Sequence, residues 1–280
     1  MPTNQQRREA VKRKLERQQE RRAEDARKRR RYTVVAAVVA VVAVVVGVVA
    51  LTMITNRTAD EVTASPPAVT PSGIPTEPAP PLKRPTALPA AATCAYPVGQ
   101  AATKPAQPPA TANISAEGTV GVALDTNSGQ IGLTLDRALA PCTVNSFVSL
   151  ASQGYFDGTS CHRLTTAPGL QVVQCGDPSA QGSGGPGYTF ADEVFPELTY
   201  GRGYLAMANS GPNTNGSQFF MIYGDAQLPP SYSVFGTITP DGLKVVDEIA
   251  KKGHDGALDP SPGGGKPITE VSIQKATVAS

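Results

Sequence analysis

Residues 205–220 read Leu-Ala-Met-Ala-Asn-Ser-Gly-Pro-Asn-Thr-Asn-Gly-Ser-Gln-Phe-Phe, and residues 161–177 read Cys-His-Arg-Leu-Thr-Thr-Ala-Pro-Gly-Leu-Gln-Val-Val-Gln-Cys-Gly-Asp. Both stretches alternate short apolar runs with Gly, Pro and Asn, which is typical of strands joined by turns. Together they hold an arginine, glutamines, asparagines and two phenylalanines, with no obvious nucleophile or acid–base pair. This inventory suits a reaction in which no covalent bond breaks.

Other chemistries fail on sequence grounds. The chain has no G-x-S-x-G elbow, and its two histidines have no evident triad partners. No C-x-x-C occurs, and the adjacent Cys161 and His162 would point to opposite faces of a strand, so no metal site and no cofactor are predicted. The glycine run at 182–187 lacks the Lys-Ser/Thr of a phosphate-binding loop and is typical of a mobile loop.

The segment from Gly118 onward predicts a mainly β domain. Residues 119–125 and 130–135 read as strands around an Asn-Ser-Gly turn, and residues 268–278 alternate as a closing strand. Helical spacing predicts one helix from Pro141 to Gly154 and another over 241–252. Many short strands with two helices favour a closed antiparallel barrel capped by helices.

Residues 207–219 resemble the central signature of the cyclophilin family, with a serine for an alanine at Ser210 at most. The His162-Arg163 pair, the group Gln174, Gly176 and Asp177, and the block 234–236 match its other signatures in the family's order. The resemblance covers residues 118–278. It implies an eight-stranded antiparallel barrel closed by two helices, with the groove outside a filled interior.

The resemblance also implies the activity, peptidyl-prolyl cis-trans isomerisation, and the residues that perform it. Arg163 would donate to the twisted prolyl nitrogen, Gln174 would orient Arg163, Asn209 would hold the peptide through its backbone, and Phe220 would line the proline pocket. Further contacts to substrate are expected from Val172, Ala208, Ser210, Gln218, Leu228 and Tyr232. The expected partners are proline-containing polypeptides.

Several positions depart from the family pattern. The spacing from Arg163 to Gln174 is three residues longer than in compact members, Tyr232 stands where histidine is common, and Gln227 takes the place of the groove tryptophan, which the chain lacks. An indole offers both a donor and a large rigid apolar face. We therefore expect reduced, though not abolished, affinity for cyclosporin-like inhibitors.

Charge and hydropathy divide the rest of the chain. Residues 1–32 carry thirteen Lys/Arg and five Asp/Glu, so the remaining residues hold 12 basic and 18 acidic groups, which argues against nucleic acid as a partner. Residues 33–55 contain no charged residue and are long enough to span a bilayer. The basic flank predicts a single-pass cell-membrane anchor with a cytoplasmic arm at 1–32 and an extracytoplasmic domain at 118–280; the alternative is a cleaved signal peptide.

Residues 56–117 are rich in Pro, Ala and Thr and predict a disordered linker. The four cysteines, Cys94, Cys142, Cys161 and Cys175, all follow the hydrophobic segment and allow three connectivities. Cys161 with Cys175 would staple the Arg163/Gln174 hairpin and Cys94 with Cys142 would pin the linker; partly free thiols are the alternative.

The leading hypothesis is therefore a membrane-anchored prolyl isomerase that assists the folding of extracytoplasmic polypeptides. The alternative is a catalytically weak binding module that grips proline motifs. Arg163 and Gln174 favour the enzyme.

Overall fold

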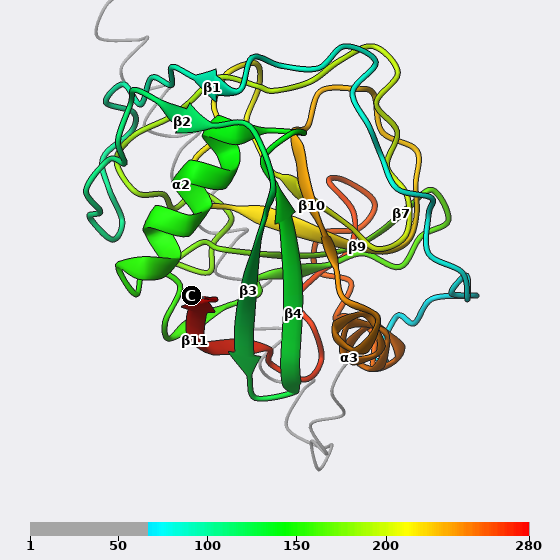
Figure 1. Cartoon of the computed structure of the whole chain (residues 1–280). Coiled ribbons are helices and arrows are strands. Elements are labelled where there is room, and N and C mark those ends of the chain that lie inside the picture. The colour runs from blue at the N-terminus through cyan, green and yellow to red at the C-terminus, as the bar shows by residue number, and fades with distance from the viewer. Residues whose placement is uncertain (1–66, 280) are drawn as a thin grey trace, which may run out of the picture. The chain divides into compact units, whose positions relative to one another are not determined.

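In the computed structural model, which describes residues 67–279, nine strands form one antiparallel sheet (Figure 1). In sheet order they are β5 (Thr159–Ser160), β11 (Ser272–Val278), β3 (Thr119–Thr126), β4 (Gly129–Asp136), β10 (Val234–Ile238), β8 (Tyr204–Met207), β9 (Phe219–Ala226), β7 (Leu170–Cys175) and β6 (Arg163–Leu164). The outermost strands, β5 and β6, are separated along the chain by Cys161 and His162 alone. The sheet therefore curls until its two ends meet in residues 159–164, and nine strands are found instead of the expected eight because this last strand is interrupted.

The β3–β4 hairpin shows why the sequence folds this way. Apolar residues on each strand alternate, so that one side of the hairpin is buried and the other half-exposed. The turn is fixed by Thr126, whose hydroxyl donates to the Gly129 carbonyl at 2.6 Å and accepts from the Ser128 amide at 3.1 Å. The predicted strands at 119–125 and 130–135 are confirmed, each extended by a residue at the turn and the second by one more at its far end.

Two helices cover the sheet, as predicted. Helix α2 (Pro141–Ser152) buries Phe147, whose ring centroid lies 4.8 Å from that of Phe156 and 5.2 Å from that of Phe219. Helix α3 (Pro240–Lys251) is capped at its N-terminus by Thr239, whose side chain accepts a hydrogen bond from the Gly242 amide. The helices thus cover the core of the sheet.

The predicted disordered linker is wrong for residues 67–117, here called the N-terminal extension. The extension runs across the molecule from beside α3 to α2 and pairs its own short strands β1 (Ala91–Ala92) and β2 (Ile114–Ser115) (Figure 1). A disulfide joins Cys94 to Cys142 at the start of α2. Lys104 Nζ donates to the carbonyls of Gly154 and Tyr155 at 3.0 and 2.8 Å. The segment is attached by backbone and polar contacts that its small apolar content did not predict.

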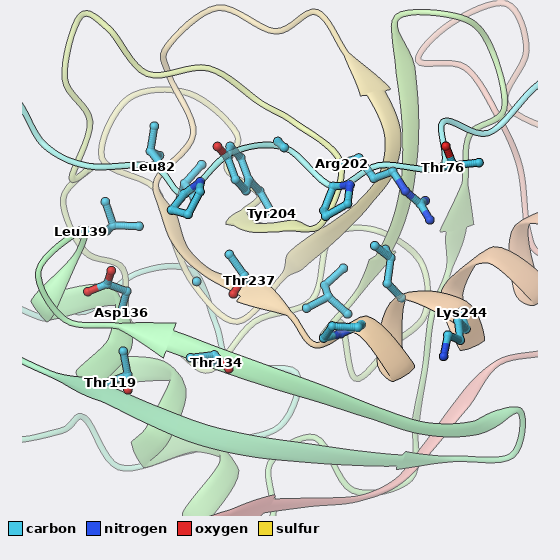
Figure 2. A pocket seen from close by; sticks show the side chains of 18 residues that line it. Thr76, Leu82, Thr119, Thr134, Asp136, Leu139, Arg202, Tyr204, Thr237 and Lys244 are labelled. Carbon is cyan, nitrogen blue, oxygen red and sulfur yellow. The ribbon is translucent and has the colours of Figure 1, made fainter.

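The extension also roofs a cavity of about 490 Å³, shown in Figure 2. Residues 76–82 form its roof, and strands β4, β8 and β10 with the start of α3 form its floor and side. Tyr204 donates its hydroxyl to the Pro80 carbonyl, and the Ala79 amide donates to the Arg202 carbonyl at 2.9 Å. None of the site residues predicted from the sequence lines this cavity.

The predicted arm at 1–32, the predicted anchor at 33–55 and the beginning of the linker lie outside the described residues. Within residues 67–279, no helix has both the length and the apolar character needed to cross a bilayer.

Candidate active site

Arg163 and Gln174 face each other across the β6–β7 pair as register partners. Arg163 Nη1 donates to Gln174 Oε1 at 3.4 Å. The Cys161–Cys175 disulfide flanks this pair, with one cysteine two residues before Arg163 and the other directly after Gln174. Both disulfide pairings expected from the sequence are therefore confirmed, and this one fixes the hairpin that carries the two polar groups.

A groove of about 280 Å³ opens beside this hairpin. Eight of the ten site residues predicted from the sequence line it: Arg163, Val172, Gln174, Ala208, Asn209, Phe220, Leu228 and Tyr232. Leu170 and Pro262 complete the lining and were not predicted. The groove thus combines an apolar floor with one guanidinium and two amides.

Aromatic packing shapes one wall of this groove. The Phe220 ring meets the Tyr232 ring edge to face at 5.7 Å, and Tyr232 in turn meets Tyr200 at 6.1 Å. The Tyr200 hydroxyl donates to the Tyr232 carbonyl at 3.0 Å and accepts from the Tyr232 amide at 2.8 Å. Because both backbone groups of Tyr232 are held, the wall is rigid at the position where the sequence departs from the common histidine.

The Arg163 guanidinium is positioned by a loop from the far end of the chain. Its Nε donates to the Gly263 carbonyl at 2.9 Å and its Nη2 to the Pro262 carbonyl at 2.5 Å. Burial lowers the pKa of Arg163, while Tyr232 and Asp259 raise it; an arginine stays protonated despite such a shift. Sequence reasoning missed this loop because the contacts use backbone carbonyls, which any residue type supplies.

Two side-chain amides are arranged in series beside the guanidinium. Gln174 Nε2 donates to Gln218 Oε1 at 3.0 Å, and Gln218 Nε2 donates to the Gly184 carbonyl at 3.1 Å. This series leaves Gln174 Oε1 directed at Arg163, the orientation that the predicted role requires. Asn209 is likewise held, because its Nδ2 donates to the Ser231 carbonyl at 2.8 Å and its Oδ1 accepts from the Gly211 amide.

The two remaining predicted residues, Ser210 and Gln218, lie in a neighbouring pocket of about 360 Å³. This second pocket shares Gln174, Ala208 and Asn209 with the groove. Gln227, which is expected at the family's tryptophan position, is exposed and lines neither pocket; its Nε2 donates to Asp225 at 3.0 Å. The predicted residues are therefore brought together, but in two adjoining compartments.

The comparisons with known proteins indicate one family. Residues 121–278 match the family described as cyclophilin type peptidyl-prolyl cis-trans isomerase/CLD. Over 210 residues the chain is 52% identical to the probable peptidyl-prolyl cis-trans isomerase B of Mycobacterium tuberculosis, covering 70% of this chain and 66% of that protein. The chain thus spans just under two thirds of the length of this relative.

Shorter relatives are covered more completely. The peptidyl-prolyl cis-trans isomerase B of Streptomyces anulatus is 39% identical over 173 residues, covering 55% of this chain and 94% of its own length. A crystal structure of a Cryptosporidium parvum cyclophilin type isomerase is 34% identical and covers 58% of this chain and 99% of its own, at a TM-score of 0.48. Since the family match takes in more than half of the chain, the protein belongs to the cyclophilin-type peptidyl-prolyl cis-trans isomerase family.

Proposed function

We propose that this chain catalyses the cis-trans isomerisation of Xaa-Pro bonds in polypeptides. The observation that carries the proposal is the groove in which the Arg163 guanidinium stands beside an apolar floor formed by Val172, Phe220 and Leu228. A proline ring is apolar and offers no N–H, so it suits such a floor. The guanidinium then lies at the edge of the bound ring, where the prolyl nitrogen would be.

The chemistry follows from the bond itself. Rotation about a peptide bond is resisted by about 18–20 kcal/mol because the nitrogen lone pair is delocalised into the carbonyl. When the bond twists, this lone pair localises on nitrogen and becomes a hydrogen-bond acceptor. A fixed donor therefore stabilises the transition state more than the planar ground state. We assign Arg163 to this role, Gln174 to its orientation and the backbone at Asn209 to holding the peptide.

Replacing Arg163 tests the proposal. In the full-length protein, Arg163→Ala should lower kcat/KM for a proline tetrapeptide by about a hundredfold to a thousandfold, the usual loss for one oriented donor. Arg163→Lys should also be poor, because an ammonium does not present the same planar fork of donors. The matched control is Arg137→Ala, at a residue outside the groove whose single side-chain hydrogen bond, to the Thr119 carbonyl, is 3.4 Å long. If Arg163→Ala kept near wild-type turnover, the assignment of Arg163 as the donor to the prolyl nitrogen would be wrong.

A second candidate, a weak binding module for proline motifs, rests on one observation. Two donors of Arg163 already bind the carbonyls of Pro262 and Gly263, which leaves fewer free for substrate. The same assay separates the two hypotheses. A module would bind proline peptides with measurable affinity while the wild-type protein failed to accelerate their isomerisation.

We further propose that the chain acts outside the cytoplasm, held at the cell membrane by residues 33–55. The uncharged run and its basic flank support an anchor, and two disulfides with no free cysteine among the described residues suit an oxidising compartment. The clients would then be extracytoplasmic polypeptides. Full-length protein should remain with membranes after carbonate extraction, whereas mature chains that all begin near Ser65 would show a cleaved signal peptide.

The expected reduced, though not abolished, affinity for cyclosporin stays a prediction about this site. Gln227 lies beside Gly169 at the edge of the groove and supplies no large apolar face. Gln227→Trp should tighten inhibition by cyclosporin at unchanged turnover. Equal inhibition of wild type and variant would show that Gln227 does not occupy the tryptophan position.

A further inference from the structure

The N-terminal extension, which lies outside the family match, reaches the edge of the candidate active site. Its Gly99 amide donates to the Gly187 carbonyl, and its Thr103 amide to the Gly185 carbonyl, both at 3.0 Å. In return the Thr189 amide donates to the Pro97 carbonyl at 3.0 Å. Residues 97–103 thus run alongside the loop 184–189.

The two segments pack closely against each other at a glycine on each side. A Cβ added to Gly99 would lie 2.8 Å from the Thr189 methyl group, and one added to Gly187 would lie 3.0 Å from Ala102 Cβ. Gly187 also has a φ of +94°, which side chains rarely adopt. Residues 97–103 are therefore seated against this loop in one position.

The second pocket lies between this segment, the loop 182–187 and residues 208–218. Gly99, Gln100 and Ala101 supply one of its walls. Because it shares Gln174, Ala208 and Asn209 with the groove, a peptide whose proline sits at Phe220 would place a nearby residue in this pocket. The wall from the extension would then touch the substrate.

The chemistry of the second pocket is polar and uncharged. Among the described residues, those that line it include no Asp, Glu, Lys, Arg or His, and its polar groups are amides, hydroxyls and backbone. A charged side chain entering it would lose part of its hydration without meeting an opposite charge. Uncharged polar side chains would find both donors and acceptors.

We propose that Gly99, Gln100 and Ala101 form the wall of a specificity subsite that selects an uncharged polar residue near the proline of the substrate. The proposal rests on the proposed function, since it concerns the same bound peptide. The extension is thereby more than an attachment: it supplies a substrate-contacting surface that the family-matched residues do not contain.

Charge substitutions at the exposed Gln100 test the wall. Full-length wild type, Gln100→Glu and Gln100→Lys are compared on proline peptides carrying Ser, Gln, Glu or Lys at each position flanking the proline. Kd and kcat/KM are both measured. At one position, wild type should prefer Ser and Gln. There Gln100→Glu should favour the Lys peptide over the Glu peptide by about two- to fivefold, the usual strength of an exposed ion pair, and Gln100→Lys should reverse the preference.

Gln107 provides the matched control. It is an exposed glutamine of the same extension, it lines none of the described pockets, and its contacts to Gln153 use only its own backbone. Gln107→Glu and Gln107→Lys should leave the peptide preferences unchanged. The subsite would be overturned if charge substitutions at Gln100 and at Gln107 shifted the peptide preferences equally, or if neither shifted them. Absent turnover in wild type with the charge-dependent Kd pattern intact would instead overturn the isomerase and leave the subsite standing.

Discussion

The two disulfides of this protein join regions with different tasks. Cys161–Cys175 spans 14 residues and encloses the strand pair that carries Arg163 and Gln174. Cys94–Cys142 spans 48 residues and fastens the N-terminal extension to the start of helix α2. The first flanks Arg163 and Gln174, which line the groove, whereas no chain neighbour of the second lines it.

From this difference we expect Cys94–Cys142 to contribute mainly to stability and Cys161–Cys175 mainly to activity. In the chain-entropy view, a disulfide that closes a longer loop stabilises more. The catalytic hairpin, in contrast, needs only a short link, because its effect is to position two side chains. The region with the larger effect on stability should therefore have the smaller effect on turnover.

The largest expected effect comes from the bond in the extension. Cys94→Ala with Cys142→Ala should lower the free energy of unfolding by about 4 kcal/mol, the loop-entropy value for 48 residues. Lys104 and Tyr96 still tie the extension to the domain, so turnover of the folded protein should change little. Denaturant unfolding without reductant measures the first quantity and a prolyl isomerase assay the second. A strong fall in kcat/KM would break the comparison.

Removing the Cys161–Cys175 disulfide should lower stability less and turnover more. Cys161→Ala with Cys175→Ala should cost about 3 kcal/mol of stability, because the closed loop is shorter. It should also lower kcat/KM by roughly tenfold, since a misplacement of about 1 Å costs up to a hundredfold. Both variants are assayed at a temperature where each is folded. If the variant without Cys94–Cys142 had the lower kcat/KM of the two, this division of roles between the disulfides would be wrong.

Asp177 offers a non-covalent counterpart to the two disulfides, because hydrogen bonds to its side chain hold the loop that follows Cys175. Its carboxylate accepts from the Ser179 amide at 2.7 Å and from the Gly182 amide at 2.6 Å. Burial acts to raise the pKa of Asp177, but the hydrogen bonds from Ser179, Gly184 and Gly182 outweigh it and leave the pKa below its usual range. This stabilisation is present above the unfolded pKa of about 3.9 and is lost as pH falls through the folded pKa.

Asp177→Asn should therefore lower stability at pH 7 by about 1.5–3 kcal/mol, the usual contribution of hydrogen bonds to a charged group. Thermal unfolding of wild type and variant at pH 7 and at pH 3 measures the gap. The gap should narrow at the lower pH. A gap that stays constant would mean that the ionised carboxylate is not what holds the loop.

The smallest effect concerns His254, which links the extension to the loop that holds Arg163. Its backbone pairs with Val69, its Nδ1 accepts from the Gly256 amide at 3.0 Å, and its Nε2 lies 2.9 Å from Thr166 Oγ1. Burial lowers the pKa of His254, while Asp259 and Asp255 oppose this. The folded state thus favours the neutral ring, and stability falls as pH drops below about 6.5, by at most about 1.4 kcal/mol per pH unit.

His254→Asn should flatten this dependence, because asparagine does not titrate and its oxygen can accept from Gly256. Burial also lowers the pKa of His162. Part of the dependence of stability on pH should therefore remain in the His254→Asn variant. Urea unfolding between pH 7 and pH 5 measures the slope for both proteins. Superimposable slopes would remove His254 from the acid response.

The sequence predicted the groove well because its side chains belong to continuous motifs. Arg163, Gln174, Asn209 and Phe220 were each found by their neighbours in the chain. The loop that holds Arg163 was missed, because its contacts are the carbonyls of residues 262 and 263 and carry no signature of residue type.

The extension was misjudged for a different physical reason. Its Pro/Ala/Thr composition lacks the large apolar residues that usually order a segment. Order comes instead from a disulfide, from backbone pairs such as that between Cys94 and Thr111, and from Arg84, which donates to the Leu139 carbonyl at 2.7 Å and stacks 5.1 Å from the Phe195 ring centre. The disulfide and the contacts of Arg84 depend on partners 48 or more residues away, so local composition does not reveal them.

The docked extension also separates two kinds of boundary that are often treated as one. The family match begins at residue 121, whereas the described compact part of the chain begins at residue 67. A fragment cut at the family boundary would carry an unpaired thiol at Cys142 and would lose the roof over strands β4, β8 and β10. The length of chain that this protein shares with its family is therefore shorter than the length that packs together in its structure.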